Sequence, residues 1–148
     1  MVRHMRLLFA VVHYYKAGDG RHGSLAADPR PRIEALQSLI LQLHRLYGQP
    51  AGLLNHRLRR VDSVDDGGGP VDLRVCVSGE CHLLGQLGNC DGLYRQEACY
   101  PDDPRLLGFE AQRVLLEASF EAERAGDPFD YIAYLEDDIL LTDADFFL

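Results

Sequence analysis

Hydrophobic residues in this chain follow two kinds of pattern. Residues 7–12 are a continuous apolar run, residues 71–77 alternate and are rich in valine, and residues 131–135 are apolar and β-prone, so all three stretches are predicted to be strands. Two longer stretches place apolar residues three and four positions apart, which predicts amphipathic helices. The first runs from Ile33 to Tyr47 and stops at Gly48, and the second opens at Pro104 and stops at Gly126.

The intervening segments are polar and rich in glycine. Residues 62–70 are predicted to form a turn, and residues 78–103 an irregular stretch that is long for a loop. After Thr142 a further helix is expected, with Thr142 or Asp143 as its N-cap. The final Phe146-Phe147-Leu148 would end that helix without a cap and expose large apolar groups. We therefore expect residues 1–148 to form a single domain that is incomplete at its C-terminus.

The order strand, helix, strand, helix, strand predicts an α/β fold, with βαβ units on a largely parallel sheet and helices on its faces. Such Rossmann-like sheets bind ligands at the carboxyl ends of their strands. Two polar clusters are expected at those ends: residues 13–24 after the first strand and residues 136–138 after the third. If these two strands are neighbours, both clusters face one crevice.

Composition and charge exclude several classes of protein. The net charge is -8, which argues against a nucleic-acid partner because a phosphate backbone requires a basic surface. No apolar run approaches the roughly 18 residues that a membrane span needs, so we expect no span and a cytoplasmic protein. The four cysteines form no C-x-x-C pair, which favours free thiols over a zinc site or disulfides.

The acidic triplet Glu136-Asp137-Asp138 directly follows the third apolar strand. Like charges about 4 Å apart repel by roughly 1 kcal/mol per pair even in water, so a cation is expected nearby. Carboxylate oxygens suit the hard divalent ions Mg²⁺ or Mn²⁺, which usually accompany a phosphate-bearing substrate. The alternative interpretation is a solvated strand end whose carboxylates favour a following helix N-terminus.

The triplet and its surroundings resemble the nucleotide-sugar-dependent glycosyltransferases of the GT-A fold. The stretch from Tyr134 to Ile139 is similar to the E-D-D variant of their D-x-D metal motif, and Asp143 to Phe147 is similar to the helix start that follows it in N-acetylglucosaminyltransferase I-type enzymes. The preceding helix with Arg113 suits the same layout. The resemblance is strong over about twenty residues near the C-terminus, and elsewhere it is architectural.

The resemblance implies a role for each matching residue. Asp138 would bind the divalent ion that bridges the donor diphosphate, while Asp137 and Glu136 would contact ribose, sugar or metal-bound water. The stretch His13-Tyr14-Tyr15 would hold the base and ribose of the nucleotide, with either tyrosine stacking on the base. The alternative for these three residues is that His13 is a packed or surface histidine and that Tyr14 and Tyr15 are core or edge aromatics.

The function implied is transfer of a sugar from a nucleotide-sugar donor, with Mn²⁺ or Mg²⁺ as cofactor, to an acceptor hydroxyl on a glycan, lipid or protein. The family takes its general base and acceptor site from the later half of the domain, so we expect this chain to supply the donor-binding region. Two alternatives stay open: a non-catalytic nucleotide-binding or interaction fragment, and a Mg²⁺-dependent phosphohydrolase. The latter would favour an early D-x-D motif, which residues 13–15 lack.

Overall fold

The computed structural model describes residues 5–18, 23–48, 52–63, 71–143 and 146–147 of the 148-residue chain. A four-stranded sheet lies at its centre, with the strands in the order β5-β4-β1-β6 and every neighbouring pair parallel. The strands are β1 (Leu7–His13), β4 (Val71–Ser78), β5 (Arg95–Cys99) and β6 (Tyr131–Glu136). The predicted α/β class with a parallel sheet is confirmed.

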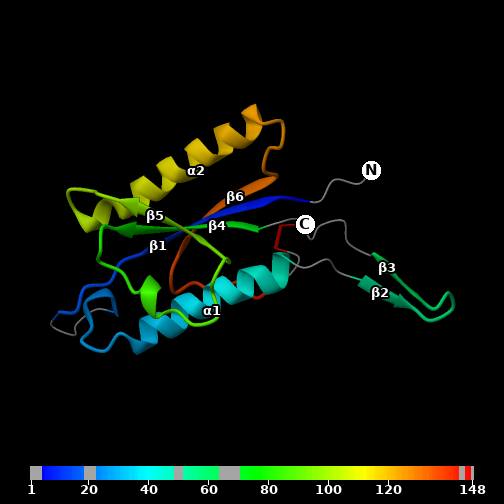
Figure 1. Cartoon of the computed structure of the whole chain (residues 1–148), viewed down its shortest axis with the longest axis horizontal. Helices are drawn as coiled ribbons and strands as arrows, with labels where there is room; N and C mark the ends of the chain where they lie inside the picture. The colour runs from blue at the N-terminus through cyan, green and yellow to red at the C-terminus, as the bar shows by residue number, and fades with distance from the viewer. Residues whose placement is uncertain (1–4, 19–22, 49–51, 64–70, 144–145, 148) are drawn as a thin grey trace.

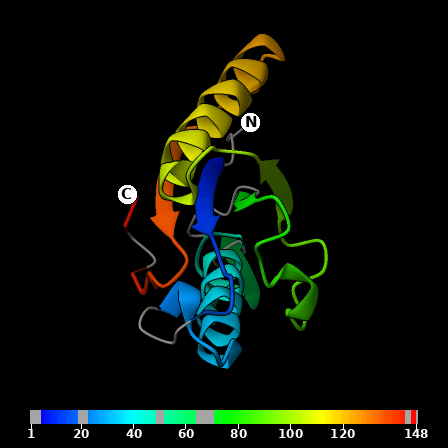
Figure 2. The same cartoon turned by 90° about the vertical axis from the view of Figure 1, so that its left-hand side faces the viewer.

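Two long helices cover opposite faces of this sheet, as Figures 1 and 2 show: α1 (Arg30–Tyr47) and α2 (Leu107–Arg124). The chain moves from β1 to β4 through α1, and returns past β1 to β6 through α2. Parallel crossovers are right-handed, so two crossovers that run in opposite directions across the sheet place their helices on opposite faces. No helix among the described residues is long and apolar enough to cross a membrane.

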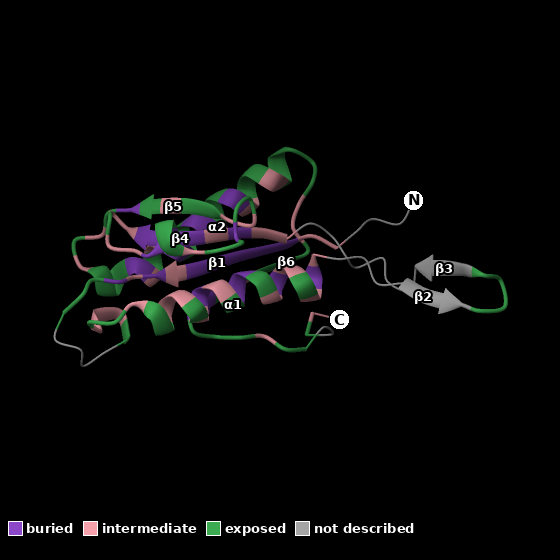
Figure 3. Cartoon of the chain, turned by 60° about the horizontal axis from the view of Figure 1, so that its bottom comes forward, coloured by how far each residue is buried: buried purple, intermediate pink, exposed green. Residues whose placement is uncertain are grey.

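Strand β1 is the most deeply buried element because it lies between two strands and two helices (Figure 3). Its side chains alternate between the faces. Leu7, Phe9 and Val11 pack with the apolar stripe of α1, whereas Leu8 and Ala10 pack with that of α2. Burial on both faces explains why this strand reads as a continuous apolar run.

Helix α2 ends where the sequence predicts. Gly126 has a φ of +74°, a left-handed conformation that glycine adopts without strain, and it follows the last helical turn. The backbone N–H of Gly126 donates to Glu123 O, and that of Asp127 donates to Ala122 O. These bonds satisfy carbonyls that the helix end would otherwise leave unpaired.

Three strands were not predicted from the sequence. Strand β5, within the predicted irregular stretch, is mostly exposed and polar, so it carries no apolar periodicity and only its pairing with β4 defines it. Strands β2 (Gly52–Asn55) and β3 (Arg60–Ser63) form an antiparallel hairpin apart from the main sheet (Figure 1). Strand β3 overlaps the start of the predicted turn, and residues 64–70 lie outside the described residues. Three short 3-10 helices complete the fold: η1 (Gly23–Leu25), η2 (Leu84–Gln86) and η3 (Pro104–Leu106).

The segment after β6 differs from its prediction. Residues 142–143 are irregular and residues 146–147 form a turn, so the described residues show no helix here, while residues 144, 145 and 148 lie outside the described part. Phe147 packs against Phe9, Tyr47 and Tyr131, with ring centroids 5.2 to 5.7 Å apart. The expected exposure of the terminal aromatics is therefore wrong for Phe147, although Phe146 is exposed.

Replacement of Phe9 by alanine tests the importance of the α1-side core. Because Phe9 is fully buried and stacks on Tyr47, Phe9→Ala is expected to lower the free energy of unfolding by about 3–5 kcal/mol. Phe109→Ala is the matched control, because that ring is 67% exposed and its loss should change stability by less than about 0.5 kcal/mol. Urea unfolding followed by circular dichroism measures both, and equal losses would contradict this assignment of the core.

Candidate functional site

A concave site lies at the carboxyl ends of β1 and β6. These strands are neighbours, as a shared crevice requires. The strand order reverses between them, since β1 leads through α1 to β4 on one side and the chain returns through α2 to β6 on the other. Open parallel sheets bind ligands at such a switch point. The cleft has a volume of about 490 Å³, which falls in the range of small-molecule sites. Its lining residues are Val12, Tyr14, Ser24, Leu25, Arg32, Pro104, Arg105, Leu107, Gly108, Tyr134, Glu136 and Asp137.

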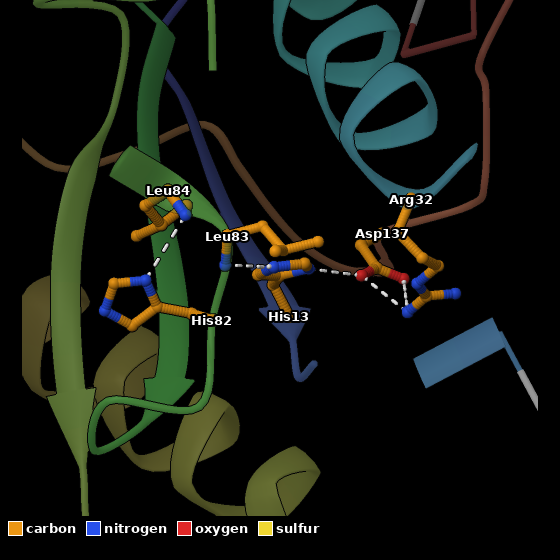
Figure 4. Close-up of polar contacts among 6 residues, drawn as sticks. All are labelled: His13, Arg32, His82, Leu83, Leu84 and Asp137. Carbon is orange, nitrogen blue, oxygen red and sulfur yellow. Dashed lines mark hydrogen bonds and ion pairs between the residues drawn. The ribbon is translucent and has the colours of Figure 1, made fainter. Parts of the chain in front are cut away.

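The middle carboxylate of the acidic triplet holds the cleft's inner wall together. Asp137 is only 4% exposed. Its Oδ2 accepts a hydrogen bond from His13 Nδ1 at 2.6 Å, and both of its oxygens lie 2.7 Å from Nη2 of Arg32 (Figure 4). With this set of partners, Asp137 bridges the end of β1 to the first turn of α1. The expected contact of Asp137 with sugar, ribose or metal-bound water stays a prediction: Asp137 lines the cleft, and among the described residues its Oδ1 accepts only from Arg32.

The ring of His13 is fully buried and both of its nitrogens have partners. The backbone N–H of Leu83 donates to Nε2 at 3.1 Å, so Nε2 is an acceptor and the proton of the neutral ring lies on Nδ1, facing Asp137. This ring is therefore closed to a nucleotide in the conformation described. The buried ring and its two partners fit the packed-histidine alternative, and a contact between His13 and a nucleotide stays a prediction.

The same polar chain continues into the loop after β4. His82 Nδ1 accepts from the backbone N–H of Leu84 at 3.2 Å, next to the bond between Leu83 and His13 (Figure 4). Two imidazoles thus accept from consecutive backbone N–H groups at the start of η2. Hydrogen bonds thus link the loop after β4 to β1, and they link β1 through Asp137 to α1. They fix these three segments relative to one another at the carboxyl edge of the sheet.

The two predicted tyrosines have separate positions. Tyr14 lines the cleft, whereas Tyr15 is buried and donates from its hydroxyl to Ala26 O at 2.6 Å. Tyr134, from β6, also lines the cleft beside Gly108, where an added Cβ would come within 3.2 Å of the tyrosine oxygen. Burial raises the pKa of both Tyr14 and Tyr134, so their phenols stay protonated at neutral pH and can donate hydrogen bonds.

Glu136 and Asp138 are the triplet members left for an ion. Glu136 lines the cleft and is exposed, and the exposed Asp138 follows in the same turn. Among the described residues, no three histidine, cysteine, aspartate or glutamate side chains converge into a ready cation site. Such an arrangement still suits Mg²⁺ or Mn²⁺, since proteins often hold these ions through one or two carboxylates together with substrate phosphates.

Both positive charges of the cleft's lining are paired with carboxylates. Arg32 is paired with Asp137, and Arg105 forms a two-pronged ion pair with Asp103 at 2.6 to 3.1 Å, which leaves Glu136 facing the space. Arg32 and Arg105, the two arginines of the lining, therefore each have a carboxylate partner. A diphosphate entering this space would meet no unpaired positive side chain among the described lining residues.

Arg32 and Tyr134 are among the residues of the cleft lining for which the sequence predicted no contact with a ligand. A signal for Arg32 does exist in the pattern of α1. The buried stripe of this helix includes Leu36, Ile40 and Leu43, and one turn before Leu36 the stripe reaches Arg32. A permanently charged residue on an apolar stripe requires a buried partner, which here is Asp137.

Other polar groups outside the cleft have ordinary structural partners. Arg113 pairs with Glu110 and Glu117 on the outer surface of α2. All four cysteines are free. Comparisons with protein-family models, curated proteins and solved structures found no match to this chain.

Asparagine substitutions test whether Asp137 and its neighbour Asp138 contribute differently to stability. Asp137→Asn leaves the charge of Arg32 uncompensated, and it should lower the free energy of unfolding by at least about 2 kcal/mol. This is less than a fully buried pair would cost, because the side chain of Arg32 keeps 19% of its surface exposed. Asp138→Asn should change stability by less than about 0.5 kcal/mol. Urea unfolding at neutral pH compares them, and an equal effect would refute the structural role of Asp137.

Thiol labelling provides a second test of this part of the fold. Burial raises the pKa of Cys76 to about 12 and also raises the pKa values of Cys90 and Cys99. Only Cys81 is partly exposed, so at pH 8 a disulfide reagent should label Cys81 rapidly and the other three only after unfolding. Cys81→Ser should abolish the rapid phase. Rapid labelling that persists in this variant would contradict the burial of the other thiols.

Proposed function

We propose that this chain forms the donor-binding region of a divalent-metal-dependent glycosyltransferase, which holds a nucleotide-diphosphate sugar for transfer to an acceptor hydroxyl. The observation that carries the proposal is the cleft between the carboxyl ends of β1 and β6, with Glu136 on its wall and Asp138 in the adjoining turn. A switch point of a parallel sheet is a common nucleotide site, and two oxygen ligands beside it fit a hard cation.

The metal dependence is supported by the charges of the cleft. Each arginine in the lining already has a carboxylate partner, while Glu136 and Asp138 add negative charge. A diphosphate would be repelled here unless a divalent cation accompanied it. When bound, such an ion would offset the negative charge that develops on the leaving nucleotide diphosphate.

The described residues also define what the protein itself contributes. Tyr14 and Tyr134 offer aromatic surface and phenolic hydroxyls to a ring, and the network of Asp137 fixes the wall between them and α1. His13 does not serve as a general base in this arrangement, because its Nε2 accepts from a backbone N–H. The cleft therefore supports donor binding and orientation. Four free thiols support a reducing, cytoplasmic setting.

Calorimetric titration with UDP and GDP, each with Mn²⁺ or Mg²⁺ and with a chelator, tests this function. Binding is expected only with metal, and Asp138→Ala should weaken it by at least about tenfold, as the loss of one metal ligand or its support typically does. Asp91→Ala is the matched control, because Asp91 is also exposed and lies outside the cleft lining. Release of UDP from a UDP-sugar in the presence of metal would then separate an enzyme from a binding module.

The result that would overturn the proposal is folded protein that binds neither nucleotide with metal present. Binding that survives both chelation and Asp138→Ala would support a nucleotide site, and it would reject the metal-dependent mechanism.

A further inference from the structure

One hydrogen-bond donor on a residue that lines the cleft has no partner among the described residues. The Nε–H of Arg32 is buried, and no described group accepts from it. Arg32 itself lines the cleft. A buried N–H without an acceptor costs free energy until it is satisfied, so an unpaired donor of this kind calls for an explanation at the site where it lies.

The guanidinium of Arg32 is fixed from two sides. Its Nη2 lies 2.7 Å from both oxygens of Asp137, which in turn accepts from His13 (Figure 4). On another side, an added Cβ at Gly23 would lie 3.4 Å from Cδ and Nη1, so the backbone of η1 packs closely against the arginine. Arg32 therefore cannot turn to another acceptor without breaking this arrangement.

The charge of Arg32 is already balanced, and this restricts the ligand group that Nε can bind. A phosphate oxygen placed beside Nε would also approach the carboxylate of Asp137, which would repel it. An uncharged oxygen, such as a hydroxyl or a ring carbonyl, accepts the hydrogen bond without that repulsion. Apolar and aromatic lining from Tyr14, Leu25 and Tyr134 suits a ring system that carries such an oxygen.

We propose that Arg32 determines specificity for the nucleoside part of the donor by donating its Nε–H to an uncharged oxygen of the base or ribose, with Asp137 and His13 as its positioning residues. This inference rests on the proposed function and divides the acidic triplet between two tasks. Asp137 orients Arg32 toward the nucleoside, and Glu136 and Asp138 remain for the ion and the diphosphate.

Arg32→Lys tests the role of Nε with little change in charge. Lysine can still pair with Asp137, but it lacks the Nε donor of the guanidinium. Its affinity for UDP or GDP with Mn²⁺ should fall by about ten- to a hundredfold, as expected for one hydrogen bond from a charged donor. Its affinity for inorganic pyrophosphate with Mn²⁺ should stay within about twofold. Arg30→Lys is the matched control, since Arg30 pairs with Asp28 at the surface, with 80% of its side chain exposed.

Nuclear magnetic resonance gives a readout that a purely structural role would not change. The Nε–H signal of Arg32, identified by its absence in Arg32→Lys, should shift when uridine or guanosine is added without metal or phosphate. In Asp137→Asn the same signal should broaden through exchange with water while the backbone spectrum keeps its folded dispersion.

Each other outcome overturns the inference in a distinguishable way. If Arg32→Lys weakens pyrophosphate as much as UDP, the arginine contacts phosphate, and the proposed function stands without this assignment. If Arg32→Lys binds UDP and GDP as the parent chain does, water satisfies Nε and the assignment is wrong. If the parent chain binds neither pyrophosphate nor nucleotide with Mn²⁺, the proposed function fails, and this inference fails with it.

Discussion

The buried carboxylate of Asp137 is the constraint on which the carboxyl edge of the sheet depends. One side chain at the end of β6 joins His13 of β1 to Arg32 of α1, and His13 in turn caps the backbone of the loop after β4. Removing a charge from such a group leaves its partner uncompensated in a partly buried site. The geometry of the cleft wall therefore follows from one ion pair and two hydrogen bonds more than from the loops that line it.

Strand order determines which side chains meet at that edge. Because β1 pairs in parallel with both β4 and β6, residues at the ends of three strands lie side by side. Glu136 is the last residue of β6, and Asp137 lies in the turn that follows it. Neighbouring carboxylates of one triplet thus have different surroundings: one is exposed in the cleft and the other is buried beneath α1. The acidic triplet therefore provides one exposed carboxylate that can meet a ligand and one buried carboxylate that holds the fold together.

The sequence was sufficient for the features that depend on local pattern. Strand β1 is continuously apolar and α1 has a regular apolar stripe, so the types and approximate limits of both elements could be predicted. The proximity of residues 13–15 to the acidic triplet could also be predicted, on the condition that β1 and β6 are neighbours in the sheet. Strand β5 could not, since its polar residues acquire their conformation by pairing with β4. The partnership of Arg32 with Asp137 joins residues 105 positions apart, and no local signal specifies such a pair.

The position of β1 in the sheet also has a consequence for how the molecule assembles. This strand precedes both of its partners in the chain, and the bond from His13 to Asp137 spans 124 residues. During synthesis, one edge of the apolar strand β1 stays unpaired until β6 has been made, and contacts of such long sequence separation form slowly. Strand β6 follows the other three strands of the described sheet in the chain, and it also completes the cleft. A small molecule that fills this space would therefore favour the docking of β6 by mass action, so that binding of the ligand and completion of the described sheet would be coupled.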